Sequence, residues 1–181
     1  MRAGYRDVMD EIPRFERPKP LSSGDERSQL ESWLNFYRAT LLKKCSGLTF
    51  DDLARRPVES STMSLLGLLR HMTFVEQIWF DVRFSGNDVV EYYRRPDDRE
   101  VAWTELESAT LDEVVATYNG ACATSNELAR GHELDEFVKS PGIGREPVDL
   151  RWIYLHMIEE YARHCGHADL LRELTDGVTG Y

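Results

Sequence analysis

The stretch LRWIYLHMIEEYARHCGHADLLREL, residues 150–174, decides the fold that the sequence predicts. It contains no proline, and its apolar residues recur at alternating spacings of three and four, the pattern of an amphipathic helix. Asp149, directly before it, is a residue type that commonly caps a helix N-terminus. The predicted inward stripe consists of Leu150, Ile153, Met157, Glu160, His164, His167 and Leu171. A carboxylate in such a stripe is costly unless it is paired, hydrogen-bonded or bound to a metal ion, so this helix predicts a polar site inside a bundle.

Three further helices with apolar stripes of the same period are expected upstream, over residues 25–45, 63–84 and 110–130. With the last helix and no convincing β-hairpin, they predict an all-α fold, a four-helix bundle with long loops between its helices. The prolines before residue 21 predict an extended N-terminal lead-in. The connection 87–109 carries a proline, many charges and several aromatic residues, and its pattern leaves a short helix and a short strand open.

Polar residues mark where these helices begin. Ser23 with Glu26, and Thr110 with Glu113, each fit a capping box, in which the hydroxyl accepts from a free backbone N–H while the carboxylate reaches back. The Ser-Thr pair at 61–62 offers a cap for the second helix. Glycine-containing runs follow the first and second helices and are expected to end them.

Composition limits the kinds of protein that the chain can be. Its 181 residues suit one compact domain, residues 1–181, and a hydrophobic content of 41% is enough for a core. The formal charge of −10 gives no global attraction to nucleic acid or anionic lipid. Three widely spaced cysteines without a CxxC motif argue against a disulfide framework. The N-terminus lacks the apolar region of a signal peptide, and no apolar run could span a bilayer, so a soluble, cytoplasmic protein is expected.

The helix over residues 63–84 offers a partner for the polar site. Its predicted stripe consists of Leu68, His71, Val75, Ile78 and Val82. His71 stands in the middle of that stripe, and central positions on neighbouring bundle helices can face each other. Glu160 and His164 are four residues apart, so both side chains reach one point beside their helix. These three residues are candidate ligands for a divalent metal, Zn(II) first and Ni(II) or Fe(II) as alternatives, with positions left open for water or substrate.

Other interpretations of the same residues stay open. Glu160 could form an ion pair with Arg163 or Arg151 and hold no metal, because ionisable clusters also arise for structural reasons. His156, one turn before Glu160, and His167 could be further ligands, hydrogen-bond donors behind the ligands, or substrate contacts.

Several segments together resemble a known family. They are RPKPLSSGDER (17–27), LLRHMTFVE (68–76), DLRWIYLHMIEEYARHCGHADLLRE (149–173) and the closing DG-x-x-G-Y (176–181). They resemble the DinB-like (DinB/YfiT) superfamily, and most closely its actinobacterial branch of mycothiol-dependent and mini-circle-type proteins. The resemblance implies a DinB/YfiT-like four-helix bundle with a metal near its mouth, and members of this superfamily often form homodimers.

By motif match, the resemblance assigns the three ligand positions to His71, Glu160 and His164, with Glu160 standing where many superfamily members have a histidine. It implies a divalent-metal-dependent thiol S-transferase that adds mycothiol or a similar small thiol to an electrophile. Alternatives are a mycothiol-dependent isomerase, a metal-dependent hydrolase and a non-catalytic metal-binding stress-response protein. The sequence departs from the isomerases in length, without their extra C-terminal domain, which favours an S-transferase or an orphan relative.

The chemistry of thiol transfer suggests roles for the residues around the ligands. His156 or His167 is expected to act catalytically, by moving a proton or by orienting a ligand through a hydrogen bond. Arg163 and Arg172 are candidates for binding the carboxylates of the thiol or the electrophile. Cys165 points about 100° away from its neighbour His164 around the helix and is expected to be packed and unreactive.

Overall fold

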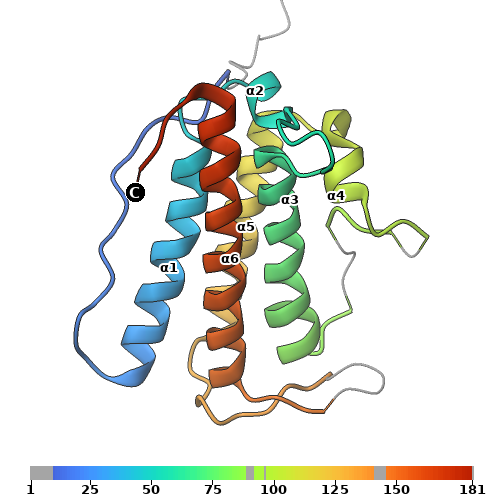
Figure 1. Ribbon diagram of the computed structural model, residues 1–181. Helices are drawn as coiled ribbons and strands as arrows, with labels where there is room; N and C mark the ends of the chain where they lie inside the picture. The colour runs from blue at the N-terminus through green and yellow to red at the C-terminus, as the bar shows by residue number, and fades with distance from the viewer. Residues whose placement is uncertain (1–9, 89–91, 96, 141–145, 181) are drawn as a thin grey trace, which may run out of the picture.

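The chain has an all-α fold in the computed structural model, as the sequence predicts (Figure 1). The structure describes residues 10–88, 92–95, 97–140 and 146–180. Its long helices are α1 (Glu26–Cys45), α3 (Leu65–Glu76), α5 (Leu111–Ala129) and α6 (Leu150–Asp176). α3 continues into a π-helical segment, Gln77–Phe84, which extends it to the end that the sequence predicts. Within the described ranges the chain forms no strand, and no helix is both long and apolar enough to cross a membrane.

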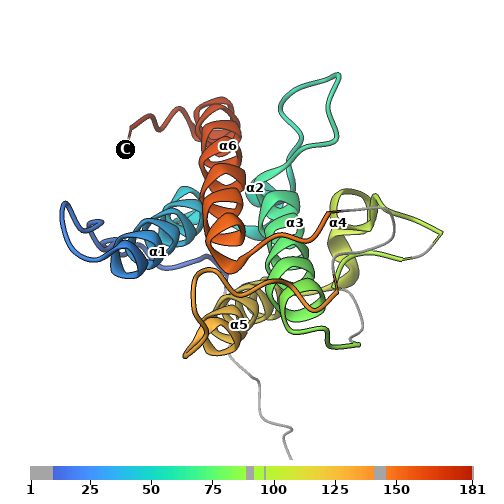
Figure 2. The same cartoon turned by 90° about the horizontal axis from the view of Figure 1, so that it is seen from below.

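The four long helices form a bundle in which α6 has α1 on one side and α3 on the other, while α5 closes the opposite side (Figure 2). The short helix α2 (Phe50–Ala54) lies in the connection between α1 and α3. In the connection 87–109, α4 (Val101–Thr104) and a 3-10 turn (Leu106–Ser108) pack on the outer side of α3 (Figure 1). The described part of this connection is therefore helical, which decides between the helix and the strand that its sequence left open.

The capping box predicted from Ser23 and Glu26 is wrong. Asp25 caps α1 instead, with its carboxylate accepting from the backbone N–H of Ser28 at 3.0 Å. Glu26 turns away from the cap and forms an ion pair with Arg151 at 2.5 Å. The tertiary pair therefore replaces the local one, and it ties the start of α1 to the start of α6.

The other predicted caps are confirmed in two cases out of three. Thr110 and Glu113 form the full capping box of α5, and the carboxylate of Asp149 caps α6. The cap predicted at 61–62 is wrong, because the chain stays extended until Ser64, whose hydroxyl caps α3. Residues 61–64 include three hydroxyl side chains. Of these, only Ser64 directly precedes the buried leucines of α3, and it is the one that caps the helix.

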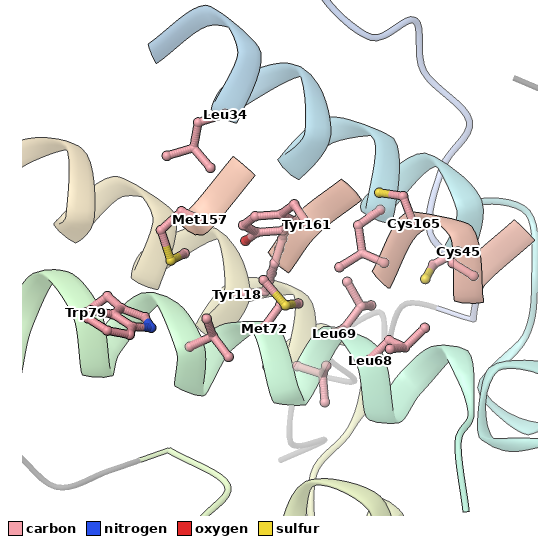
Figure 3. Packing of buried hydrophobic residues seen from close by; sticks show 14 of the residues in the cluster. Leu34, Cys45, Leu68, Leu69, Met72, Trp79, Tyr118, Met157, Tyr161 and Cys165 are labelled. Carbon is pink, nitrogen blue, oxygen red and sulfur yellow. The ribbon is translucent and has the colours of Figure 1, made fainter. Parts of the chain in front are cut away.

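The core is built by apolar side chains from all four long helices. Figure 3 shows Leu34 of α1, Met72 of α3, Tyr118 of α5, and Met157 and Tyr161 of α6 converging between the helices. Each of these side chains is almost completely buried, which for a residue of this size stabilises the fold by about 1.5–3 kcal/mol. This packing fixes how α3 and α6 sit against each other, and so it fixes the position of the candidate site between them.

A buried ion pair crosses this core and was not predicted. The guanidinium of Arg38 on α1 donates to both carboxylate oxygens of Glu76 on α3, at 2.7 and 2.6 Å. Tyr161 donates to the same carboxylate at 2.7 Å, and Arg38 also donates to Asn126 on α5 at 2.7 Å. We call Arg38, Glu76, Asn126 and Tyr161 the core polar cluster. Its hydrogen bonds connect all four long helices.

The predicted inward stripe of α6 is only partly right. Tyr161, Cys165 and Ala168 are buried, while Glu160 and His167, which were placed in the stripe, are only partly buried at its edge. An α-helix has 3.6 residues per turn, so a repeat of 3.5 drifts around it by about 20° per heptad. Over this long helix the drift moves two polar positions from the core to its rim.

Candidate metal centre

The three predicted ligands come together between α3 and α6, which lie side by side (Figure 1). One donor atom from each of His71, Glu160 and His164 lies within 4.8 Å of the others. The Nε2 atom of His164 is 3.5 Å from Oε2 of Glu160, and the ring centroids of the two histidines are 4.8 Å apart. The sequence therefore predicted the convergence of these side chains from two helices correctly.

Burial keeps both histidines of this group neutral. It lowers the pKa of His71 from 6.5 to about 4. It also lowers the pKa of His164 to about 3, with further lowering from the neighbouring imidazoles of His71 and His167. A metal ion binds only neutral imidazole and ionised carboxylate, so these two rings have the protonation state of ligands at neutral pH. Two imidazoles and one carboxylate from rigid helices fit a divalent metal such as Zn(II).

The arginines that could have neutralised Glu160 are engaged elsewhere. Arg163 pairs with Glu159, one position before Glu160, and Arg151 pairs with Glu26. Within the described part of the chain, the only basic groups within ion-pair distance of the Glu160 carboxylate are imidazoles. The interpretation of Glu160 as one half of a simple ion pair therefore has no support from these contacts.

His156 lies beside the other oxygen of Glu160. Its Nε2 atom is 3.6 Å from Oε1, whereas His164 faces Oε2. The ring of His156 is stacked on Trp152 at 4.8 Å and meets the edge of Trp79 at 4.6 Å, and burial lowers its pKa. The structure thus brings His156 to the site and packs its ring against two indoles, which also contact each other.

His156, Glu159 and Glu160 form a second group with metal-ligand spacing. All three lie on one turn of α6, and the carboxylate of Glu159, 48% exposed, is already paired with Arg163. Surface carboxylates of this kind are common without a metal. The group that joins α3 to α6 is the better candidate because it is drawn from two helices and because, among the residues that the structure describes, no arginine pairs with its carboxylate.

His167 contacts the back of a predicted ligand. Its Nδ1 atom is 3.3 Å from Nδ1 of His164, whose Nε2 faces Glu160. Only one of the two Nδ1 atoms can carry the shared proton. If His164 donates it, the Nε2 of His164 keeps its lone pair directed at the site.

The two predicted binding arginines differ in position. Arg163 is 55% exposed and lies on the outer face of α6, next to the site but paired with Glu159. Arg172 is buried, and its guanidinium donates to the carbonyls of Lys44 and Ser46 at the end of α1, at 2.9 and 2.8 Å. The structure therefore does not bring Arg172 to the site, where it would be needed to bind substrate, and shows it joining α6 to α1.

One neighbour of the site was missed by sequence reasoning. Trp103 of α4 stacks on the ring of His71, with centroids 5.3 Å apart and the planes at 29°. It lies in the connection 87–109, whose pattern gave no assignment, and nothing in the sequence ties it to a residue 32 positions earlier.

A helical bundle with two imidazoles and a carboxylate converging between two of its helices is the arrangement that the resemblance to DinB-like proteins implies. The family model described as mycothiol-S-transferase matches residues 29–177. The chain therefore belongs to the mycothiol S-transferase family, a DinB-like family. No curated protein matches the chain.

Proposed function

We propose that this protein is a divalent-metal-dependent thiol S-transferase that uses mycothiol or a similar low-molecular-weight thiol. The observation that carries the proposal is the donor set of His71, Glu160 and His164, neutral at both imidazoles and formed by two packed helices. Family membership supports the thiol and the transfer reaction. Zn(II) fits two nitrogens and one oxygen best, and Ni(II) or Fe(II) is compatible with the same donors.

A divalent metal in this group supplies a Lewis acid that favours the thiolate over the thiol. The reaction forms a sulfur–carbon bond and breaks the S–H bond and one bond of the electrophilic carbon, whose electron pair goes to the leaving group or is protonated; the thiol proton must leave the sulfur before or during that step. We assign the acceptor role to His156, because burial lowers its pKa and keeps the ring neutral, while the carboxylates of Glu160 and Glu159, 3.6 Å from its two nitrogens, would stabilise the ring once protonated. The exposed Glu159 then offers a route for the proton to solvent.

His167 has a different role in the proposal. As the acceptor for Nδ1–H of His164, it fixes the tautomer in which Nε2 of His164 is free to bind. Arg163, exposed beside the site, is the proposed contact for a substrate carboxylate, which would compete with Glu159 for its guanidinium.

The attacking sulfur is proposed to come from the cosubstrate and not from the chain. Burial raises the pKa of Cys165 to about 12, and burial together with Glu76 raises the pKa of Cys122 to about 12. Burial raises the pKa of Cys45 as well. A thiol with such a pKa is almost entirely protonated at neutral pH and is a poor nucleophile.

The test combines metal analysis with a conjugation assay on the purified protein. We expect about one divalent metal per chain and formation of a thiol conjugate with a reactive electrophile, both lost in His71→Ala and His164→Ala. His132→Ala is the matched control, because His132 pairs with Glu136 away from the site. A wild-type protein that binds no divalent metal, or variants that conjugate as fast as wild type, would overturn the proposal.

Two further outcomes separate the alternative functions. Conversion of an electrophile without a thiol conjugate would identify an isomerase or a hydrolase using the same residues. Metal binding that raises the melting temperature, with no thiol bound in calorimetry, would identify a non-catalytic metal-binding protein. A single domain and a homodimer stay predictions, which limited proteolysis and light scattering would test.

A further inference from the structure

The ring of His71 is supported in an unusual way for a proposed metal ligand. Ligating imidazoles almost always donate their second ring N–H to a carbonyl, a carboxylate or water, which fixes the ring. Among the residues that the structure describes, none forms a hydrogen bond with His71. Its ring lies instead against the face of Trp103, with centroids 5.3 Å apart. The face of the indole thus contacts the face of the imidazole, where it can restrict rotation of the ring about its bond to Cβ.

The chain makes room for this indole at Gly67, one turn before His71 on α3. A Cβ atom at Gly67 would lie 2.6 Å from Cε3 of Trp103, closer than real Cβ contacts. The helical Gly67 has no positive φ that would require glycine. Because Gly67 has no side chain, the indole can approach α3 closely.

Two arginines hold the segment that carries the indole. Arg70, adjacent to His71 and fully buried, donates to the carbonyls of Glu105 at 2.5 Å and Val101 at 3.1 Å. Arg56 donates to the carbonyl of Trp103 itself at 2.6 Å. Arg70 of α3 thus holds the backbone on both sides of the indole, and Arg70 is the residue directly before the proposed ligand His71.

We propose that Trp103 is a positioning residue, clamped by Gly67 and Arg70, that holds the imidazole of His71 in the orientation facing Glu160 and His164. The inference depends on the proposed function in one respect, namely that His71 binds a metal ion. Without the indole, the ring can rotate about its bond to Cβ, and the donor atoms of the group no longer converge. We call Trp103, Gly67 and Arg70 the tryptophan clamp.

The first test measures Zn(II) affinity by competition with a chelating dye. Trp103→Ala is expected to weaken binding about 10–100-fold, as for loss of an orienting partner, and Trp103→Phe to recover most of it. Trp33→Ala is the matched control, since Trp33 packs on α1 against Phe36 and Tyr37 and leaves the site untouched. Equal affinities for Trp103→Ala and wild type would overturn the clamp.

A double-mutant cycle distinguishes positioning from a general effect on the fold. If Trp103 acts through His71, then Trp103→Ala weakens Zn(II) binding in wild type but changes nothing further in His71→Ala. Losses that add up in the double variant would show that the indole acts by another route and would overturn the proposal.

A metal-free measurement keeps the clamp separate from the proposed function. In proton NMR, the ring current of the indole is expected to shift the ring protons of His71, and the shift should vanish in Trp103→Ala. Gly67→Ala should reduce the same shift while keeping the indole, and it serves if Trp103→Ala fails to fold. A wild-type protein that shows the shift but binds no metal refutes the proposed function alone. A His71 signal unchanged by either substitution refutes the clamp.

Discussion

Two polar clusters interrupt the apolar interior of this bundle, and they differ in how their carboxylates are satisfied. Glu76, in the core polar cluster, has both oxygens engaged by strong donors: Arg38 at 2.7 and 2.6 Å and Tyr161 at 2.7 Å. Glu160, at the rim between α3 and α6, faces imidazole nitrogens at 3.5 and 3.6 Å, and no arginine or lysine of the described residues pairs with it. The hydrogen-bonding capacity of the Glu76 carboxylate is thus used within the protein, whereas the Glu160 carboxylate keeps capacity to bind a ligand.

This difference separates a structural cluster from a functional one better than residue type does. Both clusters place a glutamate opposite a basic group on another helix. A buried charge with complete hydrogen bonds stabilises one arrangement of the helices and has nothing left to offer a ligand. A partly buried carboxylate beside neutral imidazoles lacks a positive partner, and a divalent cation supplies one. The following predictions test this separation, beginning with the largest effect.

Arg38→Ala should cost about 3–5 kcal/mol of unfolding free energy, because it leaves the carboxylate of Glu76 buried without its cation. Urea denaturation measures the loss. The matched control is Arg151→Ala, which removes a solvent-screened pair with Glu26 and should cost far less. Equal losses for the two variants would contradict the structural role of the core polar cluster.

His164→Ala should do the reverse. We expect Zn(II) binding to weaken by more than about 100-fold, since a ligand contributes more than an orienting partner does. In the absence of metal, the unfolding free energy should fall by much less than in Arg38→Ala, because His164 is a neutral imidazole and, within the described residues, it pairs with no arginine or lysine. Calorimetric metal titration measures the Zn(II) affinity, and urea denaturation of the same sample measures the unfolding free energy. A large loss of stability in metal-free His164→Ala would place this residue with the structural cluster.

His167→Ala should weaken Zn(II) binding about 10-fold, less than loss of His164, because it removes only the acceptor that selects the tautomer of His164. His167→Asn, which retains an acceptor, should restore part of the affinity. Competition with a chelating dye measures both. An unchanged affinity in His167→Ala would show that the contact between the two Nδ1 atoms does not orient the ligand.

The sequence predicted the convergence of His71, Glu160 and His164 but not the core polar cluster, and the reason is physical. Histidines are rare enough that His71 and His164 stand out within apolar stripes, and helical spacing brings Glu160 to the same point. Glu76 follows His71 by five positions and looks like any surface glutamate, because the partner that buries it lies 38 residues away. Tertiary packing decides which helices contact each other and at which positions along their lengths. The sequence of a single helix cannot predict this.

The same limit explains the smaller errors. The cap at Asp25 was missed because Glu26 prefers Arg151, a partner 125 residues away. Trp103 was missed because its contact with His71 depends on Gly67, whose lack of a side chain matters only when an indole approaches. Local signals sufficed where the structure is local, as at the capping box of Thr110 and Glu113. They failed where a tertiary contact replaces a local one.

The smallest expected effect is in the cysteines, and it reports on both clusters at once. Sγ of Cys122 is 3.8 Å from Glu76 and from the hydroxyl of Tyr161, so this thiol lies against the core polar cluster. Burial and Glu76 raise its pKa to about 12, so its reactive thiolate forms only as the pH rises toward 12, and at pH 8 a disulfide reagent should label the folded protein very slowly. Unfolded protein, with free access to all three thiols, is the control.

Arg38→Ala should increase labelling of Cys122 at pH 8, because opening the core polar cluster admits water and reagent to a thiol that is already partly exposed. His164→Ala should leave the rate at the wild-type value, since the polar and ring contacts that the structure describes for His164 are with Glu160, His71 and His167, which lie outside that cluster. Rapid labelling of wild type at pH 8 would contradict the raised pKa, and it would reopen a role for a cysteine of the chain as the nucleophile. Faster labelling in both variants would show that the two clusters open together, and that satisfied and unsatisfied carboxylates in this bundle are not independent.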